Sequence, residues 1–233
     1  MNTLIDAIAI VIPLIFAIVF HEVAHGLMAR ALGDPTAQER RRLSLNPLRH
    51  VDPFGTIILP GALHLAGLPV FGWAKPVPVN YNRLRNPKRD MAFVGAAGPA
   101  INFVFAVLTA VAFGLIVRGL GPAGTPGPVL GFVLTSFAYF MSFNISLGMF
   151  NLLPLPPFDG SRILRGILPW SAARQLDRIE PFGIIVFFGI FVILPQIMPS
   201  LHFADRVLLP PVLWAEHQLD AIITLVAGRP VVL

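Results

Sequence analysis

Two histidines and a glutamate interrupt an apolar stretch near the start of the sequence, where FHEVAHGLM occupies residues 20–28. His21 and His25 are four residues apart, so on a helix their imidazoles lie on one face. The pattern H-E-x-x-H on a helix typically provides two zinc ligands and a glutamate that acts as general base toward a metal-bound water. We therefore expect a catalytic zinc site, with His21 and His25 as ligands and Glu22 as the base.

A third zinc ligand is expected elsewhere, because catalytic zinc sites usually have three protein ligands and one open position. Asp159, in NLLPLPPFDG at residues 151–160, is the preferred candidate, since the prolines before it end a helix and let the chain fold back. The alternatives are other carboxylates and the remaining histidines, His50, His64, His202 and His217. A plain turn at Asp159, and a histidine cluster that only packs helices, are the competing interpretations.

The composition indicates that these residues lie in a membrane. The chain has 233 residues, of which 55% are hydrophobic and 12% charged, and its mean hydropathy is +0.75. Soluble domains have roughly 25% charged residues. Ionisable side chains inside a membrane helix are costly and usually functional, which favours a metal site over simple packing. The chain has no cysteine, which excludes disulfides and thiolate ligands.

The expected fold class is an all-α polytopic membrane protein with about five transmembrane helices. A spanning helix needs about 20 mostly apolar residues. The candidates are residues 4–32, 91–117, 129–153, 182–198 and, as the weakest, 206–227. The last segment contains Glu216, His217 and Asp220, so an interfacial helix is the alternative there. We expect a single membrane domain over residues 1–233, with a core at 4–165 and C-terminal helices at 182–227.

Lysine and arginine are distributed unevenly between these segments. Ten of the 17 lie from Arg30 to Arg89 and four from Arg162 to Arg178, whereas the 118–128 connection has only Arg118. By the positive-inside rule, both basic loops face the cytoplasm and the N-terminus faces the opposite side. The positive charge is therefore interpreted as an orientation signal, and no nucleic-acid partner is expected. The N-terminus lacks the features of a cleaved signal peptide, so we expect it to be retained.

The connection between the first two segments ends in an unusual apolar sequence, DPFGTIILPGALHLAGLPVFGWAKPVPVN, at residues 52–80. Its glycines and prolines argue against a spanning helix. GTIIL and KPVPVN are expected to be extended, so we predict a membrane-associated, partly β re-entrant loop over about residues 50–80. Such a loop could pair with an unwound substrate by β-augmentation. An interfacial linker packed on the cytoplasmic face is the alternative.

Three motifs together, HEVAHG, AGPAIN at residues 97–102 and NLLPLPPFDG, resemble the site-2 protease family of intramembrane zinc metalloproteases, peptidase family M50. The resemblance covers about residues 15–165 and is closest to compact members without PDZ or CBS domains. The family's last motif is commonly N-x-x-P-x-P-x-L-D-G, and here Phe158 stands at the leucine position, which keeps an apolar residue there.

The resemblance implies one Zn²⁺ per chain, bound by His21, His25 and Asp159, with Glu22 activating the water. It also places Asn151 near the scissile carbonyl as an oxyanion donor, although packing explains Asn151 equally well from the residues alone. It implies an endopeptidase that cleaves within or near the transmembrane helix of a single-spanning membrane protein. The expected location is a bacterial or archaeal cell membrane, with the active site toward the cytoplasm.

Other functions also fit a metal site in a membrane. A zinc transporter would have acids and histidines on several helices along a path, whereas here the candidate ligands cluster at one depth beside a glutamate in the base position. A non-catalytic metal-binding scaffold is a related alternative. A soluble-type metallopeptidase anchored by one helix would need a polar catalytic domain, which the sequence lacks. For Asn102, which follows AGP in the second segment, helix packing is the preferred interpretation.

Overall fold

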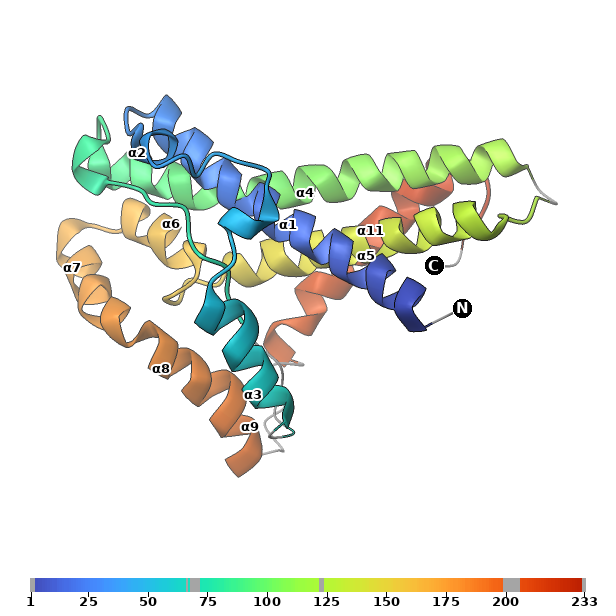
Figure 1. The fold of residues 1–233 in the computed structure, drawn as a ribbon. Coiled ribbons are helices and arrows are strands. Elements are labelled where there is room, and N and C mark those ends of the chain that lie inside the picture. Colours follow the sequence, from blue (N-terminus) through green and yellow to red (C-terminus); the bar gives the residue numbers. More distant parts are fainter. Residues whose placement is uncertain (1–2, 66, 68–71, 122–123, 199–205, 232–233) are drawn as a thin grey trace.

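The computed structural model describes residues 3–65, 67, 72–121, 124–198 and 206–231, which form helices and connecting segments without any strand (Figure 1). Four helical segments of this part are long and apolar enough to cross a membrane. They are α1 (Thr3–Ala31), α4 (Pro87–Leu120), α5 (Pro128–Asn151) and a continuous helical run from Trp170 to Ile197. The prediction of an all-α polytopic membrane protein is confirmed.

Shorter helices connect or extend these segments. They are α2 (Thr36–Glu39), η1 (Pro47–Arg49), η2 (Pro53–Ile58), α3 (Leu59–Leu65), η3 (Tyr81–Arg83), α6 (Asp159–Ile167) and α11 (Leu209–Ala227). The helical run after Trp170 consists of α7 (Trp170–Ile179), η4 (Glu180–Phe182), α8 (Gly183–Phe188), η5 (Gly189–Ile193) and α9 (Leu194–Ile197). Proline in the first turn of both α4 and α5 suits the helix start, where its missing N–H has no helical partner.

Helix α4 is the central element, because it packs against α1, α5, α6 and α11. In Figure 1 the long helices α1, α4 and α5 run alongside one another, while α8 and α9 diverge from them. The largest buried cluster lies between α4, α5 and α11 and includes Phe113, Met141 and Ile223. Helix α1, which bears the histidine pair, packs directly against α4.

The fifth predicted segment forms α11, but α11 is not among the four candidate spans. Glu216, His217 and Asp220 lower its hydropathy, as the sequence indicated. The helix still packs on α4 and α5, and Ser142 of α5 donates a hydrogen bond to Glu216 Oε1 at 2.8 Å. Residues 199–205 of the predicted C-terminal region lie outside the described residues.

The loop predicted as partly β has a different structure in its first half. GTIIL, expected to be extended, lies within η2 and α3. Asp52 caps this helical segment, because its Oδ1 accepts hydrogen bonds from the N–H groups of Phe54 at 3.0 Å and Gly55 at 2.7 Å. KPVPVN has no helical turn, consistent with an extended chain. Residues 66 and 68–71 of the predicted loop lie outside the described residues.

Residues 74–80, here called the return segment, lead from this loop toward α4. At its start, the Lys75 N–H donates to His50 O at 2.8 Å, and Arg42 Nη2 donates to Lys75 O at 2.8 Å. At its end, the Asn80 N–H donates to Asp34 Oδ2 at 2.5 Å. The return segment is therefore fixed to the polypeptide that follows α1 at both of its ends.

Asp34 is fully buried and carries the second of these anchors. Its Oδ1 accepts hydrogen bonds from the Thr36 hydroxyl and from the Thr36 N–H. Burial alone would raise the pKa of Asp34, but the hydrogen bonds from Thr36 and from the Asn80 backbone, with the nearby Arg83 charge, outweigh it and lower the pKa. The ionised carboxylate is thus the form that holds the return segment.

Candidate metal centre

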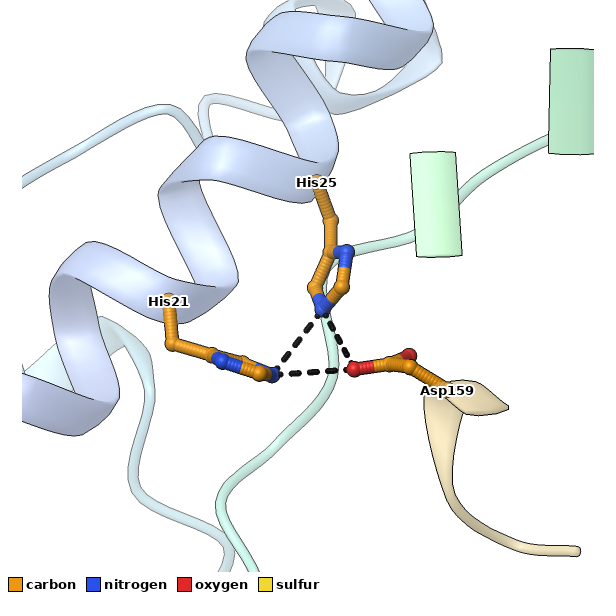
Figure 2. Close-up of side chains that lie close together, drawn as sticks. All are labelled: His21, His25 and Asp159. Atoms are coloured by element: carbon orange, nitrogen blue, oxygen red, sulfur yellow. Dashed lines mark hydrogen bonds and ion pairs between the residues drawn. The ribbon is translucent and has the colours of Figure 1, made fainter. Parts of the chain in front are cut away.

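Two histidines of α1 and the first residue of α6 converge inside the helix bundle, as Figure 2 shows. His21 Nε2 and His25 Nε2 each lie 3.1 Å from Asp159 Oδ2. The two Nε2 atoms are 3.0 Å apart, and all three side chains are buried. Among the residues that the structure describes, this is the only group of three or more histidines and acids arranged to hold a metal ion.

The local structure explains how residues separated by 138 positions meet. On α1 the i, i+4 spacing stacks the imidazoles on one face, with ring centroids 4.6 Å apart. Asp159 is brought back to them by the proline-rich turn after α5 and begins α6. The return of the chain that the sequence suggested therefore occurs.

Gly98 of α4 lies directly against both imidazoles. A Cβ atom at this position would lie 2.5 Å from His21 Cε1 and from His25 Nε2. Helix α4 therefore comes very close to α1 at this glycine. In the structure the approach is to the candidate ligands themselves, so the missing side chain leaves the space that the rings occupy.

The donor atoms fit a zinc ion. His25 Nδ1 lies 2.7 Å from Val94 O. A backbone carbonyl only accepts, so Nδ1 carries the hydrogen and a neutral His25 presents a lone pair at Nε2. This lone pair faces an imidazole nitrogen and a carboxylate oxygen, a nitrogen and oxygen set that zinc prefers. Separations of 3.0–3.1 Å are slightly shorter than the edge of about 3.3 Å of a tetrahedron with bonds of about 2.0–2.1 Å.

Each candidate ligand also has an outer hydrogen-bond partner, as metal ligands usually do. His25 has the Val94 carbonyl, and His21 Nδ1 lies 2.6 Å from Asn102 Oδ1. Asp159 Oδ1 accepts from Arg162 Nη1 at 3.0 Å. Helix packing was the preferred interpretation for Asn102, and the structure shows that it contacts a histidine of the site instead.

Glu22 lies beside the converging residues on α1 and is half-buried. Its Oε2 accepts a hydrogen bond from the Val77 N–H of the return segment at 2.8 Å. Val77 is itself buried against α1, near Gly26. The return segment therefore contacts the candidate general base directly.

Asn151 is not brought into the cluster in this structure. It is the last residue of α5, and its Nδ2 donates to Leu147 O of the same helix at 2.9 Å. Within the described residues, no hydrogen bond joins Asn151 to the two histidines or to Asp159.

None of the alternative histidine ligands that the structure describes belongs to the cluster. His50 Nε2 donates to Ser44 O at 2.8 Å in the loop after α1. His217 is exposed on α11, whereas the side chain of His64 and the whole of His202 lie outside the part of the chain that the structure describes.

Sequence reasoning missed three groups around the site. The Val94 carbonyl is a backbone atom and has no sequence signal. Arg162 stands three residues after Asp159, a spacing at which helical side chains meet. Asn144 is a fully buried amide in an apolar segment, which is itself a signal, and its Oδ1 accepts from Asn102 Nδ2 at 2.7 Å.

Comparisons with known proteins agree with this chemistry. The profile of peptidase family M50 matches residues 125–194. The "Putative zinc metalloprotease YwhC" of Bacillus subtilis is 36% identical over 189 residues, which are 78% of this chain and 80% of the relative. The "Putative zinc metalloprotease Rip2" of Mycolicibacterium smegmatis is 28% identical over 190 residues, 81% of this chain and 66% of the relative.

A third relative is archaeal. The "Zinc metalloprotease MJ0392" of Methanocaldococcus jannaschii is 35% identical over 82 residues, 35% of this chain and 21% of the relative. No solved structure is significantly similar to the chain. The identity to YwhC extends over most of both chains and, with the family profile, establishes the relationship. The chain therefore belongs to peptidase family M50 and is an integral membrane zinc metalloprotease.

Proposed function

We propose that this protein is an intramembrane endopeptidase, with His21, His25 and Asp159 as the ligands of one Zn²⁺. Its substrates would be membrane proteins that are cleaved within or near a transmembrane helix. The observation that carries the proposal is the convergence of three buried donor atoms within a bundle of apolar helices (Figure 2). Membership of family M50 supports the same activity.

In the proposed mechanism, Glu22 is the general base. When bound, Zn²⁺ would supply a Lewis acid that acidifies a water and polarises the scissile carbonyl. The Glu22 carboxylate accepts a proton from the attacking water and delivers it to the leaving amine. The bond from the Val77 N–H to Oε2 orients this carboxylate, and we assign the proton transfer to Oε1.

Asn151 is proposed as a donor to the oxyanion of the substrate carbonyl. Its position at the end of α5, eight residues before Asp159, supports this role. In the structure its amide donates to Leu147 O within the helix, so the substrate carbonyl would have to take over that hydrogen bond.

The return segment is proposed to align the substrate. A helical substrate has its backbone groups already paired, so it must unwind before hydrolysis, and an extended segment offers new partners by β-augmentation. The bond between Val77 and Glu22 places the return segment beside the proposed base. The clustering of basic residues in the loops around α2 and α6 supports a cytoplasmic location of the site in a bacterial or archaeal membrane.

The test is cleavage of a panel of single-spanning membrane helices by purified wild type and Glu22→Gln, with zinc content measured for both. We expect the variant to keep its zinc and to lose activity by about 10²–10⁴-fold, the usual contribution of a general base. Glu216→Gln is the matched control, because Glu216 is another half-buried acid of the helix bundle and bonds Ser142.

Zinc bound by both proteins without cleavage by either would contradict the proposal. Zinc flux in liposomes would then distinguish a transporter from a scaffold. Loss of zinc from Glu22→Gln would also contradict the assigned role, since a general base is not needed to hold the metal.

A further inference from the structure

The side chains of Asn102 and Asn144 connect the proposed ligand His21 to α5. His21 Nδ1 lies 2.6 Å from Asn102 Oδ1, and Asn102 Nδ2 lies 2.7 Å from Asn144 Oδ1. Asn144 Nδ2 lies in turn 2.7 Å from Phe140 O, a backbone carbonyl of α5. Both amides are fully buried. An uninterrupted chain of hydrogen bonds therefore crosses from α1 through α4 to α5.

Two backbone carbonyls fix the direction of every bond in this chain. Phe140 O only accepts, so the Asn144 atom that faces it must be the NH₂ group, and the Asn144 oxygen then faces Asn102. The Asn102 NH₂ group donates to that oxygen and also lies 3.3 Å from Ala17 O of α1. The Asn102 oxygen must consequently face His21, where it only accepts.

We propose that Asn102 and Asn144 are positioning residues that set the tautomer and ring orientation of His21. The hydrogen of His21 is held on Nδ1 by Asn102, so the Nε2 lone pair is directed at the position between His25 and Asp159. This inference rests on the proposed role of His21 as a zinc ligand. Through Asn144, α5 then helps to position His21, although none of the three proposed ligands lies on α5.

The ring orientations of the two histidines are therefore fixed by different kinds of group. His25 donates to the Val94 carbonyl, a backbone group that no substitution removes. His21 depends on two side chains, and outer hydrogen-bond partners of metal ligands typically contribute 10–100-fold to metal affinity. Of the outer partners of the two histidines, we therefore expect the amides of Asn102 and Asn144 to be the ones that substitution can remove.

The first experiment uses the wild-type protein with ¹¹³Cd²⁺ as the probe and ¹⁵N-labelled histidine. Cadmium–nitrogen coupling identifies which ring nitrogen of each bound imidazole contacts the metal. We expect two imidazoles, each coupled through Nε2 and each carrying a hydrogen on Nδ1. Coupling of His21 through Nδ1, or a His21 ring without a hydrogen on Nδ1, would overturn the proposal.

The second experiment compares Zn²⁺ affinities by chelator competition for the full chain in lipid nanodiscs. Asn102→Leu should bind Zn²⁺ about 10–100-fold more weakly than wild type. Asn144→Leu should lose less, because Ala17 O still orients the Asn102 amide. Thr109→Val is the matched control, since Thr109 is a buried polar residue of α4 that takes no part in these hydrogen bonds. The Zn²⁺ affinity of Thr109→Val should equal that of wild type.

These outcomes separate the inference from the proposed function. Equal Zn²⁺ affinities of wild type, Asn102→Leu and Asn144→Leu would overturn the inference even if all three proteins cleave substrate. The expected order of affinities in a protein that cleaves no substrate would support the inference and contradict the endopeptidase proposal. If Asn102→Leu fails to fold, as judged by its thermal unfolding, the wild-type cadmium spectrum and Asn144→Leu decide.

Discussion

The two oxygens of Asp159 face different partners. Oδ2 lies 3.1 Å from Nε2 of both His21 and His25, whereas Oδ1 accepts a hydrogen bond from Arg162. Asp159 is buried and Arg162 reaches it from a partly exposed position one helical turn later. A carboxylate held in this way can turn only one oxygen toward a metal. Arg162 therefore restrains the direction of the proposed ligand.

We expect Arg162→Ala to weaken Zn²⁺ binding by about 10-fold, because Asp159 would lose the donor that orients it. The measurement is chelator competition with the purified protein. Arg174→Ala is the matched control, since Arg174 is an exposed arginine of the neighbouring helix α7. Equal affinity of Arg162→Ala and wild type would show that the ion pair is not part of the metal site.

At the residue scale, the sequence predicted the residues that meet but not all of their partners. His21, Glu22 and His25 have a fixed spacing on one helix, and Asp159 follows a proline-rich turn that brings it back. The role of Asn102 could not be predicted, because its contact with His21 depends on how α4 is rotated against α1. The family resemblance implied that Asn151 lies near the scissile carbonyl, whereas in the structure its side-chain amide donates a hydrogen bond to Leu147 O of the same helix.

The return segment has two proposed roles, to orient Glu22 and to pair with the substrate backbone. Proline substitutions at Val77 and Val79 separate these two roles. Val77→Pro removes the N–H that donates to Glu22, so we expect kcat to fall by about 10-fold or more while zinc stays bound. Val79→Pro removes an N–H group of the segment proposed to pair with substrate, so we expect KM to rise instead.

The measurement is steady-state cleavage with zinc content. Val77→Ala and Val79→Ala are the controls, because each keeps its backbone N–H. Unchanged cleavage by both proline variants would refute both tasks of the return segment.

The hydrogen bond between Asp34 and the return segment predicts that the stability of the folded protein depends on pH. The pKa of Asp34 is lowered in the folded protein, so the unfolded state binds more protons as pH falls. The stabilisation by Asp34 is therefore complete above its unfolded pKa of about 3.9 and is lost as pH falls through the folded value. We expect thermal unfolding between pH 7 and 3 to be less pH-dependent in Asp34→Asn than in wild type.

Asp34→Asn should also be less stable at pH 7 by about 1–3 kcal/mol, because one of the buried donors around Asp34 loses its acceptor. Asp220→Asn on the exposed face of α11 is the control and should keep the wild-type pH dependence. Parallel pH curves for wild type and Asp34→Asn would contradict the assigned anchor.

Among the elements, the long apolar helices were predictable and the loop was not. Residues 4–32, 91–117 and 129–153 became α1, α4 and α5 with small changes at their ends, because length and hydropathy define a spanning helix. GTIIL was expected to be extended, and its β-branched residues do favour strands, but the cap at Asp52 and the proline after it favour a helix start. Local capping outweighed residue propensity there.

For the whole molecule, α4 joins the proposed site to the remaining elements. It packs on α1 and α6, which bear the three proposed ligands, and on α5 and α11. We propose on this basis that the chain forms one membrane domain, as the sequence suggested. The number of helices that cross the bilayer was less predictable, since α11 packs with the bundle although its polar residues reduce its hydropathy.

The proposed orientation can be tested because the chain has no native cysteine. Single cysteines at Arg40, in the loop after α1, and at Thr125, between α4 and α5, are both exposed. In intact cells a membrane-impermeant maleimide should label Thr125→Cys, and Arg40→Cys should react only after the cells are opened. The reverse pattern would contradict the cytoplasmic location of the site, and the unsubstituted protein is the background control.

Gly98 has a consequence for how a substrate can enter. Because α4 lies against both imidazoles at this glycine, and Asn102 and Val94 of α4 bond the two histidines, α1 and α4 cannot separate without breaking the outer hydrogen bonds of both proposed ligands. We therefore expect a substrate helix that enters laterally from the bilayer to leave the contact between α1 and α4 intact. The return segment contacts Glu22 through one backbone hydrogen bond, and moving Val77 away from the base would leave the three proposed ligands and their outer partners in place.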